Sequence, residues 1–259
     1  TCALPISGTG QLGRIQGTLS NATNVTVERY IPAAGRRYRM IAPSVNTTGS
    51  IKGNWMEGNM NTSGANVNTV AGYGTQITGP GGNANGFDVT GTNSASLYLT
   101  TNGVTPGYAS ISKTTDTLSA LTGYFLFIRG DRSMNMNLFN TNVAPNPIPL
   151  PSSTTTLRAT GTIVQGPVNS FTNALSNAAG GFSLITNPYP AAIDWASVYA
   201  ASSNLENYYT YWDPNLGFRG GFTTVTTAGI SAPSSSATNI IQSGQAFFVT
   251  TTANGVPII

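Results

Sequence analysis

The sequence predicts an all-β protein made of two packed β-sandwich-like modules, with only short helical turns. Charged residues make up 7% of the 259 residues, against about 25% in an ordinary soluble domain. Thr, Ser, Asn and Gly replace them, and these residues favour turns and strands over helices. Short stretches rich in β-branched and aromatic residues alternate with Gly, Asn, Pro and Ser clusters, which is typical of strands separated by turns. No amphipathic helical pattern of any length accompanies them.

The apolar stretches define the expected strands. Two of them, Tyr124–Arg129 and Ser133–Phe139, are expected to form a hairpin, because Met134 and Met136 alternate with asparagines in the second arm. Short helical turns are expected at Ser170–Ala178 and Ala192–Ala200. The remaining strands are predicted at Asn24–Tyr30, Arg37–Ala42, Thr155–Val164, Phe182–Thr186, Tyr208–Trp212, Phe222–Thr227 and Gln245–Thr251.

A proline-rich stretch at residues 144–151 is the expected linker, because its prolines favour an extended chain and forbid pairing within a sheet. It separates an N-terminal module, residues 1–143, from a C-terminal module, residues 152–259. Both modules contain an apolar strand ending near a proline, then a tryptophan, then an apolar strand led by glycine. This order indicates either a diverged internal duplication or two unrelated sets of strands. The matching features are Tyr38–Pro43, Trp55 and Gly123–Ile128, and then Phe182–Pro188, Trp195 and Gly244–Val249.

Composition argues against most kinds of catalysis. The chain has no histidine and one cysteine, Cys2, so Ser-His and Cys-His nucleophile pairs, an internal disulfide and a cysteine-type zinc site are all excluded. We therefore expect no enzyme activity, no metal and no cofactor. The acidic residues show neither a marked pair for glycoside hydrolysis nor an Asp-x-Asp-x-Asp calcium loop. They are Glu28, Glu57, Asp88, Asp116, Asp131, Asp194, Glu206 and Asp213.

The net charge of +3 is unevenly distributed. Residues 1–39 hold five arginines and one glutamate, a balance of +4, so the other 220 residues sum to −1. A nucleic-acid-binding protein would spread many more cations along one face, and no nucleic-acid partner is expected. No apolar run approaches the length of about 18 residues that a membrane span needs, so membrane insertion is not expected either.

Three segments share a recognisable set of motifs: residues 181–195, which contain Asn187-Pro188-Tyr189-Pro190 and Ile193-Asp194-Trp195, then Tyr211–Pro214, and then Ile241–Val249. They resemble the "GNPYP…IDW" segment and the "YxWDP" and "GQaFFV" strands of a family of secreted and cell-surface proteins of the Bacteroidota. Such regions lie near the C-terminal end of type IX secretion substrates. The resemblance implies an extracellular or cell-surface location and no catalytic residues. The sorting domain that usually follows is expected either to have been removed during export or to belong to a longer chain.

Two groups of residues are candidates for ligand or subunit contacts. In a strand, Tyr208 and Trp212 would share one face and Tyr209 and Tyr211 the other, so one pair could be exposed for stacking on sugars or for a protein interface. The alternative is burial of both faces in a sandwich. At the C-terminus, the turn Asn254-Gly255 and the apolar residues Val256, Ile258 and Ile259 read as an unfinished hairpin. It could fold back on its own sheet or add to the edge of a neighbouring subunit.

Two short motifs have weaker implications. Asp116-Thr117-Leu118 resembles the O-glycosylation motif of the Bacteroidota, which makes Thr117 a candidate modification site. Arg129-Gly130-Asp131 matches an integrin-type tripeptide, although a turn explains it better. Taken together, these features predict a structural or adhesive extracellular protein that associates with itself or with other extracellular proteins. A glycan-binding module is the alternative.

Overall fold

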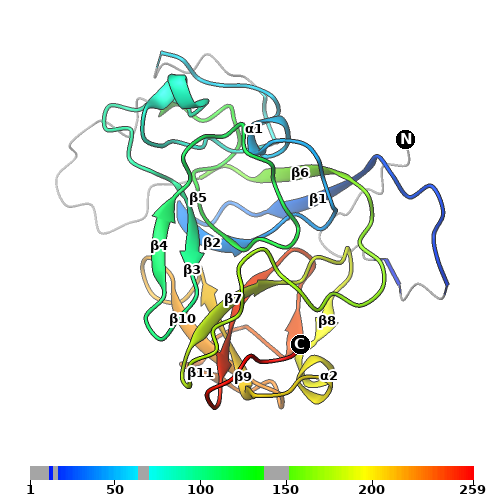
Figure 1. Cartoon of the computed structure of the whole chain (residues 1–259). Coiled ribbons are helices and arrows are strands. Elements are labelled where there is room, and N and C mark those ends of the chain that lie inside the picture. The colour runs from blue at the N-terminus through cyan, green and yellow to red at the C-terminus, as the bar shows by residue number, and fades with distance from the viewer. Residues whose placement is uncertain (1–11, 14–16, 64–69, 137–151) are drawn as a thin grey trace.

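The computed structural model describes residues 12–13, 17–63, 70–136 and 152–259, and it shows an all-β protein with short helices (Figure 1). The helices are α1 (Ile51–Asn54), α2 (Trp195–Ala201) and a 3-10 turn, η1 (Gly82–Asn85). The strands are β1 (Val25–Ile31), β2 (Arg37–Ile41), β3 (Leu97–Thr101), β4 (Gly107–Ser110), β5 (Tyr124–Ile128), β6 (Thr155–Gly161), β7 (Phe182–Thr186), β8 (Ile193–Asp194), β9 (Leu205–Asp213), β10 (Gly221–Thr226), β11 (Ser231–Ala232), β12 (Ile240–Ile241) and β13 (Ala246–Thr251).

The strands form stacked layers (Figure 1). The antiparallel pair β1-β6 covers one face of a four-stranded sheet in the order β2-β5-β3-β4, which we call the N-terminal sheet. The other face of that sheet packs on a five-stranded sheet in the order β11-β10-β9-β13-β7, the C-terminal sheet. Helix α2 covers the far face of the C-terminal sheet. Each sheet is therefore covered on both faces, which explains the apolar runs in its central strands.

Alternation along the central strands sends side chains into different cores. In β5, Tyr124 and Leu126 face the core beneath β1-β6, whereas Phe125 faces the C-terminal sheet. In β13, Phe247 faces the core beneath α2, whereas Phe248 faces the N-terminal sheet. The central residues of both strands are buried, and Phe247 is only 1% exposed.

Both sheets connect their strands in the same way. The chain order β2, β3, β4, β5 becomes the spatial order β2-β5-β3-β4. Apart from the short edge strand β11, the chain order β7, β9, β10, β13 likewise becomes β7-β13-β9-β10. In each case the last strand inserts between the first two, and all neighbours are antiparallel. This shared topology is what an internal duplication predicts.

A short helix bearing or adjoining a tryptophan recurs at the same point of both modules. Ser50 caps α1 and Asp194 caps α2, each by accepting a hydrogen bond from a backbone N–H of the first turn. Trp55 meets the ring of Tyr124 edge-on with the centroids 5.3 Å apart, and Trp195 meets Phe247 at 6.1 Å. Both tryptophans are buried.

The two sheets bury matching faces against each other. Met40 and Phe125 from the N-terminal sheet pack with Leu184 and Phe248 from the C-terminal sheet. The sheets approach closely beside Gly123, because a Cβ atom at this position would lie 2.6 Å from the side chain of Leu184. Glycine is therefore required here for packing and not for a turn.

The predicted hairpin arm Ser133–Phe139 is wrong. Gly130 adopts a φ of 118°, and the carboxylate of Asp131 accepts hydrogen bonds from the backbone of Gly72 at 2.7 Å and of Ser133 at 2.9 Å. The chain therefore turns away from β5, and Arg132 enters the interior (0% exposed). Residues 131–136 form turns, and residues 137–139 lie outside the described part of the chain.

The helical turn predicted at Ser170–Ala178 is also wrong. Its backbone bonds to distant segments instead: Thr172 N donates to Leu121 O at 3.0 Å, and Ser176 N donates to Ser183 Oγ at 2.8 Å. The expected linker, residues 144–151, lies outside the described residues. The next strand, β6, returns to the N-terminal module and pairs with β1, from Val25 opposite Gly161 to Ile31 opposite Thr155. By pairing, β6 thus belongs with β1 and not with the C-terminal sheet.

Candidate functional site

The aromatic cluster of β9 is divided between two cores. Tyr209 is 1% exposed beneath α2, where its hydroxyl donates to Thr238 O, and burial raises its pKa. Tyr211 packs at the edge of the same core, and burial raises its pKa as well. Trp212 lies on the opposite face, between the two sheets, and Tyr208 is half-buried. The four side chains therefore form no common exposed platform.

Trp212 belongs instead to a row of rings that reaches the surface at both ends. The row runs from Tyr108 through Phe125 and Trp212 to Phe222, with neighbouring centroids 5.5, 5.3 and 5.0 Å apart. Its ends are exposed, since Tyr108 is 47% and Phe222 is 40% accessible. The sequence did not reveal this row. Tyr108 lies far from Trp212 along the chain, and Phe222 lies on the neighbouring strand β10.

Residues in the segments that resemble secreted proteins hold the fold together. Asn187 is fully buried, and its side-chain amide donates to the carbonyls of Ala191, Ile241 and Gln242. The carboxylate of Asp213 accepts hydrogen bonds from Asn215 N at 2.8 Å and from the hydroxyl of Ser235. These contacts account for both side chains without a ligand.

The acidic residues mostly serve structural contacts as well. Asp88 forms an ion pair with Arg132, Glu57 with Arg158, and Asp116 with Lys113. Asp131, the last residue of the adhesion-like tripeptide, is 6% exposed and bonded within its turn. Asp194 caps α2 with hydrogen bonds from Ala196 N at 3.2 Å and Ser197 Oγ at 2.9 Å. Within the described ranges, no three acidic or cysteine side chains gather as a metal site would require.

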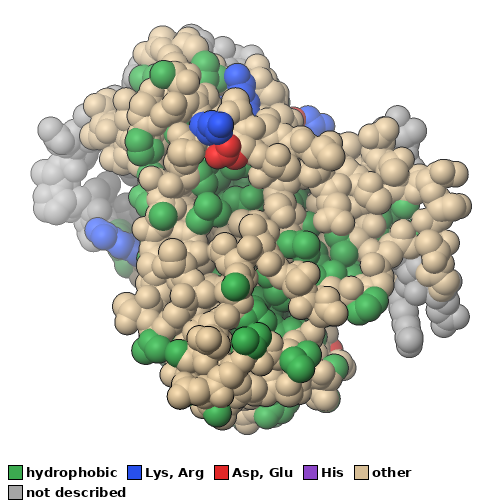
Figure 2. Space-filling view, in the orientation of Figure 1, with side chains coloured by type: hydrophobic (Ala, Val, Ile, Leu, Met, Phe, Trp, Pro, Cys, Tyr) green, Lys and Arg blue, Asp and Glu red, His purple; other side chains and the backbone are tan. Residues whose placement is uncertain are grey.

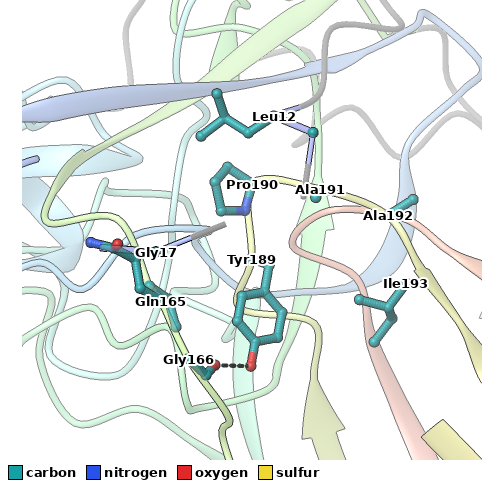
Figure 3. A pocket seen from close by; sticks show the side chains of 11 residues that line it. Leu12, Gly17, Gln165, Gly166, Tyr189, Pro190, Ala191, Ala192 and Ile193 are labelled. Atoms are coloured by element: carbon teal, nitrogen blue, oxygen red, sulfur yellow. Dashed lines mark hydrogen bonds between the residues drawn. The ribbon is translucent and has the colours of Figure 1, made fainter. Parts of the chain in front are cut away.

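One cavity of about 590 Å³ opens beside the turn before β8 (Figure 3). Apart from Gln165 and Tyr189 its side chains are small or apolar, and the hydroxyl of Tyr189 donates to Gly166 O at 2.6 Å. Leu12, Gly13 and Gly17 complete the lining and flank residues 14–16, which are not described. The cavity offers no acid, base or nucleophile beyond this tyrosine among its lining residues.

The C-terminal tail folds back on its own chain but leaves apolar groups outside. Ile258 forms a two-bond bridge with Ser203, with N–O distances of 2.9 and 3.2 Å. Pro257 is buried, and Ile259 packs against the core beneath α2. Val256 and Ile258, however, expose 69% and 64% of their surface. The backbone of the tail therefore folds back on its own chain, which is one of the two alternatives expected from the sequence. The side chains of Val256 and Ile258 remain exposed to solvent.

Thr117 is exposed at a site where the chain is held firmly. Its neighbours are anchored, since Leu118 is buried and donates its N–H to Gly49 O at 3.0 Å, and Asp116 O accepts from Ile51 N at 2.9 Å. The hydroxyl-bearing side chain thus lies on the surface beside a fixed backbone. Cys2 lies outside the described residues.

Strand β4 is an open edge of the N-terminal sheet. It pairs with β3, and Ile111 N donates to Leu97 O just beyond the strand. Because hydrogen-bonded pairs alternate along antiparallel strands, Ala109 bonds toward β3 and the backbone groups of Tyr108 and Ser110 point away from it. Among the described residues nothing pairs with this outer side. Figure 2 shows that the surface in this view is mostly neutral, with few charged groups.

No known protein family, curated protein or solved structure matches this chain. The resemblance to secreted Bacteroidota proteins therefore rests on the motifs themselves. None of the helices in the described ranges is long and apolar enough to cross a membrane.

Proposed function

We propose that this protein is a non-catalytic structural or adhesive component that works outside the cell as a subunit of a larger assembly. The observation that carries the proposal is the open edge of β4. Tyr108 and Ser110 direct backbone N–H and C=O groups away from β3, where a strand of a second copy could pair with them.

The edge lacks the features that normally prevent such pairing. No charged residue occurs between Asp88 and Lys113, a stretch that contains both β3 and β4. Soluble monomers usually protect an exposed edge with lysine, proline or a bulge. At the turn of the β3-β4 hairpin, Val104 is 58% exposed and adds apolar surface. Within β4 itself a neighbouring strand would thus meet neither a charged residue nor a proline.

The C-terminal tail gives a second contact surface. Its backbone is fixed by the bridge to Ser203, so covering Val256 and Ile258 would cost little further ordering of the chain. Complete burial would contribute about 1.5–3 kcal/mol per side chain. The segments that resemble type IX secretion substrates support an extracellular location.

Size measurements on paired variants test the proposal. Ser110→Pro removes an outward N–H without breaking a bond to β3, and a residue before proline readily keeps an extended backbone. Ser110→Ala keeps the N–H and is the matched control. In sedimentation velocity and electron microscopy, wild type and Ser110→Ala should form large species, and Ser110→Pro should form smaller ones. A wild-type protein that is monodisperse at 26.8 kDa would contradict the proposal.

The second candidate function is glycan binding, and the aromatic row is the observation that favours it. Phe222 and Tyr108 are exposed next to the buried Phe125 and the half-buried Trp212, and exposed rings can stack on sugars. Glycan-array binding by a monomeric protein, lost in Phe222→Ala and Tyr108→Ala, would support this function. Absence of binding by the wild type would remove it.

A further inference from the structure

Three arginines converge where the N-terminal module meets the end of β9. Arg29 comes from β1, and Arg37 and Arg39 are two residues apart on β2, so they share a face of that strand. Arg37 Nη1 donates to Pro214 O, just after β9, and Arg29 Nη1 donates to Ser243 O, just before β13. Both guanidinium groups are thus fixed by neutral carbonyls of the C-terminal module.

The positive charge of this cluster is poorly balanced. None of the ion pairs found among the described residues includes Arg29, Arg37 or Arg39. The negative charge of Asp213 raises the pKa of Arg39. The oxygens of Asp213, however, already accept hydrogen bonds from Asn215 N and the Ser235 hydroxyl. Arg39 is half-buried, and its guanidinium group takes part in none of the side-chain hydrogen bonds or ion pairs found within the described part of the chain.

The surrounding protein disfavours the charged forms of Arg29 and Arg39. Burial lowers the pKa of Arg29 and of Arg39, and the repulsion between Arg29 and Arg39 and between Arg37 and Arg39 adds to this effect. The electrostatic interaction of Tyr211 with Arg29 and Arg39 acts on the pKa of both arginines in the opposite direction. Partly desolvated cations without an anionic partner are costly, so an added anion would relieve the repulsion.

We propose that Arg39, with Arg29 and Arg37, binds the oxyanion group of an acidic ligand, a carboxylate or a sulfate. A guanidinium group presents parallel N–H donors that match two oxygens of such a group. Arg39 supplies the free donors, while the two fixed arginines supply the positive field. The site is independent of the β4 edge and of the tail, so it stands whether or not the chain assembles.

Binding measurements with defined probes test this site. Isothermal titration calorimetry would use inorganic sulfate, an oligomer of a uronic acid, and a neutral oligosaccharide of equal length, at matched ionic strength. We expect sulfate or the uronate oligomer to bind and the neutral sugar not to bind. The uronate oligomer alone would identify a carboxylate site, and sulfate as well would identify a general oxyanion site. Absence of binding by both anions would overturn the proposal.

Charge-matched variants separate a built site from general attraction. Arg39→Gln should weaken anion binding by about tenfold or more, because it removes charge-assisted hydrogen bonds. Arg219→Gln removes the same charge from an exposed position and should change binding by less than about twofold. Without ligand, Arg39→Gln should melt at the same temperature as the wild type or higher, since it removes an unbalanced charge. Equal loss of binding in both variants would overturn the site, as would a clear loss of thermal stability in ligand-free Arg39→Gln.

Discussion

Breaking the buried ion pair between Asp88 and Arg132 should destabilise the protein strongly. Both side chains are fully buried, and two N–O contacts of 2.9 and 3.1 Å join them. Asp88 also accepts from the backbone N–H groups of Asn61 at 2.6 Å and Ile77 at 2.8 Å, and Arg132 donates to Thr75 O at 2.9 Å. The pair thus ties together four segments that have little regular structure, around Asn61, Thr75–Ile77, Asp88 and Arg132.

The expected magnitude follows from what each substitution leaves behind. Arg132→Met removes the cation and leaves the Asp88 carboxylate buried with two backbone donors and no counter-charge. Asp88→Asn leaves the Arg132 guanidinium without an anion and places an amide next to backbone donors. Removing one partner of a buried pair costs about 3–5 kcal/mol. The double variant should cost less than the sum of the two single variants, because neither charge is then left alone.

Urea unfolding followed by tryptophan fluorescence measures these free energies. The matched control is the surface pair of Lys113 and Asp116, whose charged groups are 3.6 Å apart and whose side chains are 55% and 44% exposed. Lys113→Met should change the free energy of unfolding by less than about 0.5 kcal/mol. If Arg132→Met costs no more than this control, the buried pair does not stabilise the fold and our account of residues 129–136 is wrong.

The remaining predictions concern the core, the surface threonine and the tail. Phe247→Ala should lower the free energy of unfolding by about 3–5 kcal/mol, and Phe222→Ala, which truncates a ring that is 40% exposed, should lower it clearly less; equal losses would contradict the assigned burial. Native Thr117 should bear a covalent sugar that peptide mass spectrometry detects as added mass, and a wholly unmodified native peptide would exclude this. Deleting residues 256–259 should shift the assemblies to smaller species in sedimentation velocity without unfolding the domain, and an unchanged size distribution would exclude a role for the tail.

The strands that the sequence predicted well are those with apolar residues on both faces. β5 and β13 are central strands, and their runs of aromatic and branched residues mark them clearly. The cap at Asp194 was also predictable, because a short acidic side chain before a helix start accepts backbone N–H groups. By contrast, β4 consists of Gly, Tyr, Ala and Ser, a composition that resembles the surrounding loops, so only its pairing with β3 identifies it.

The false hairpin shows why local pattern is insufficient. Met134 and Met136 alternate as a strand would, but the pairing of Arg132 with Asp88 is made across 44 residues and decides the backbone there. The candidate contacts depended on tertiary structure in the same way. The exposed ends of the aromatic row come from β4 and β10, and the arginine cluster joins β1 and β2 to the end of β9. The spacing of these residues along the chain therefore does not indicate that their side chains lie close together.

The matching faces of the two sheets have a consequence for how copies of this chain could grow into a larger structure. A surface patch that binds the same patch on a second copy ordinarily produces a closed, symmetric dimer. Here both counterparts belong to one polypeptide, and Met40 and Phe125 already meet Leu184 and Phe248, so this surface cannot recruit another molecule. The outer edge of β4 is open, whereas β10, the equivalent strand, is covered by β11. Within the described part of the chain, the strand equivalent to β4 therefore offers no open edge of its own. If each chain offers that edge to a different surface of the next, successive copies would add head to tail, and the resulting fibre would have two unlike ends.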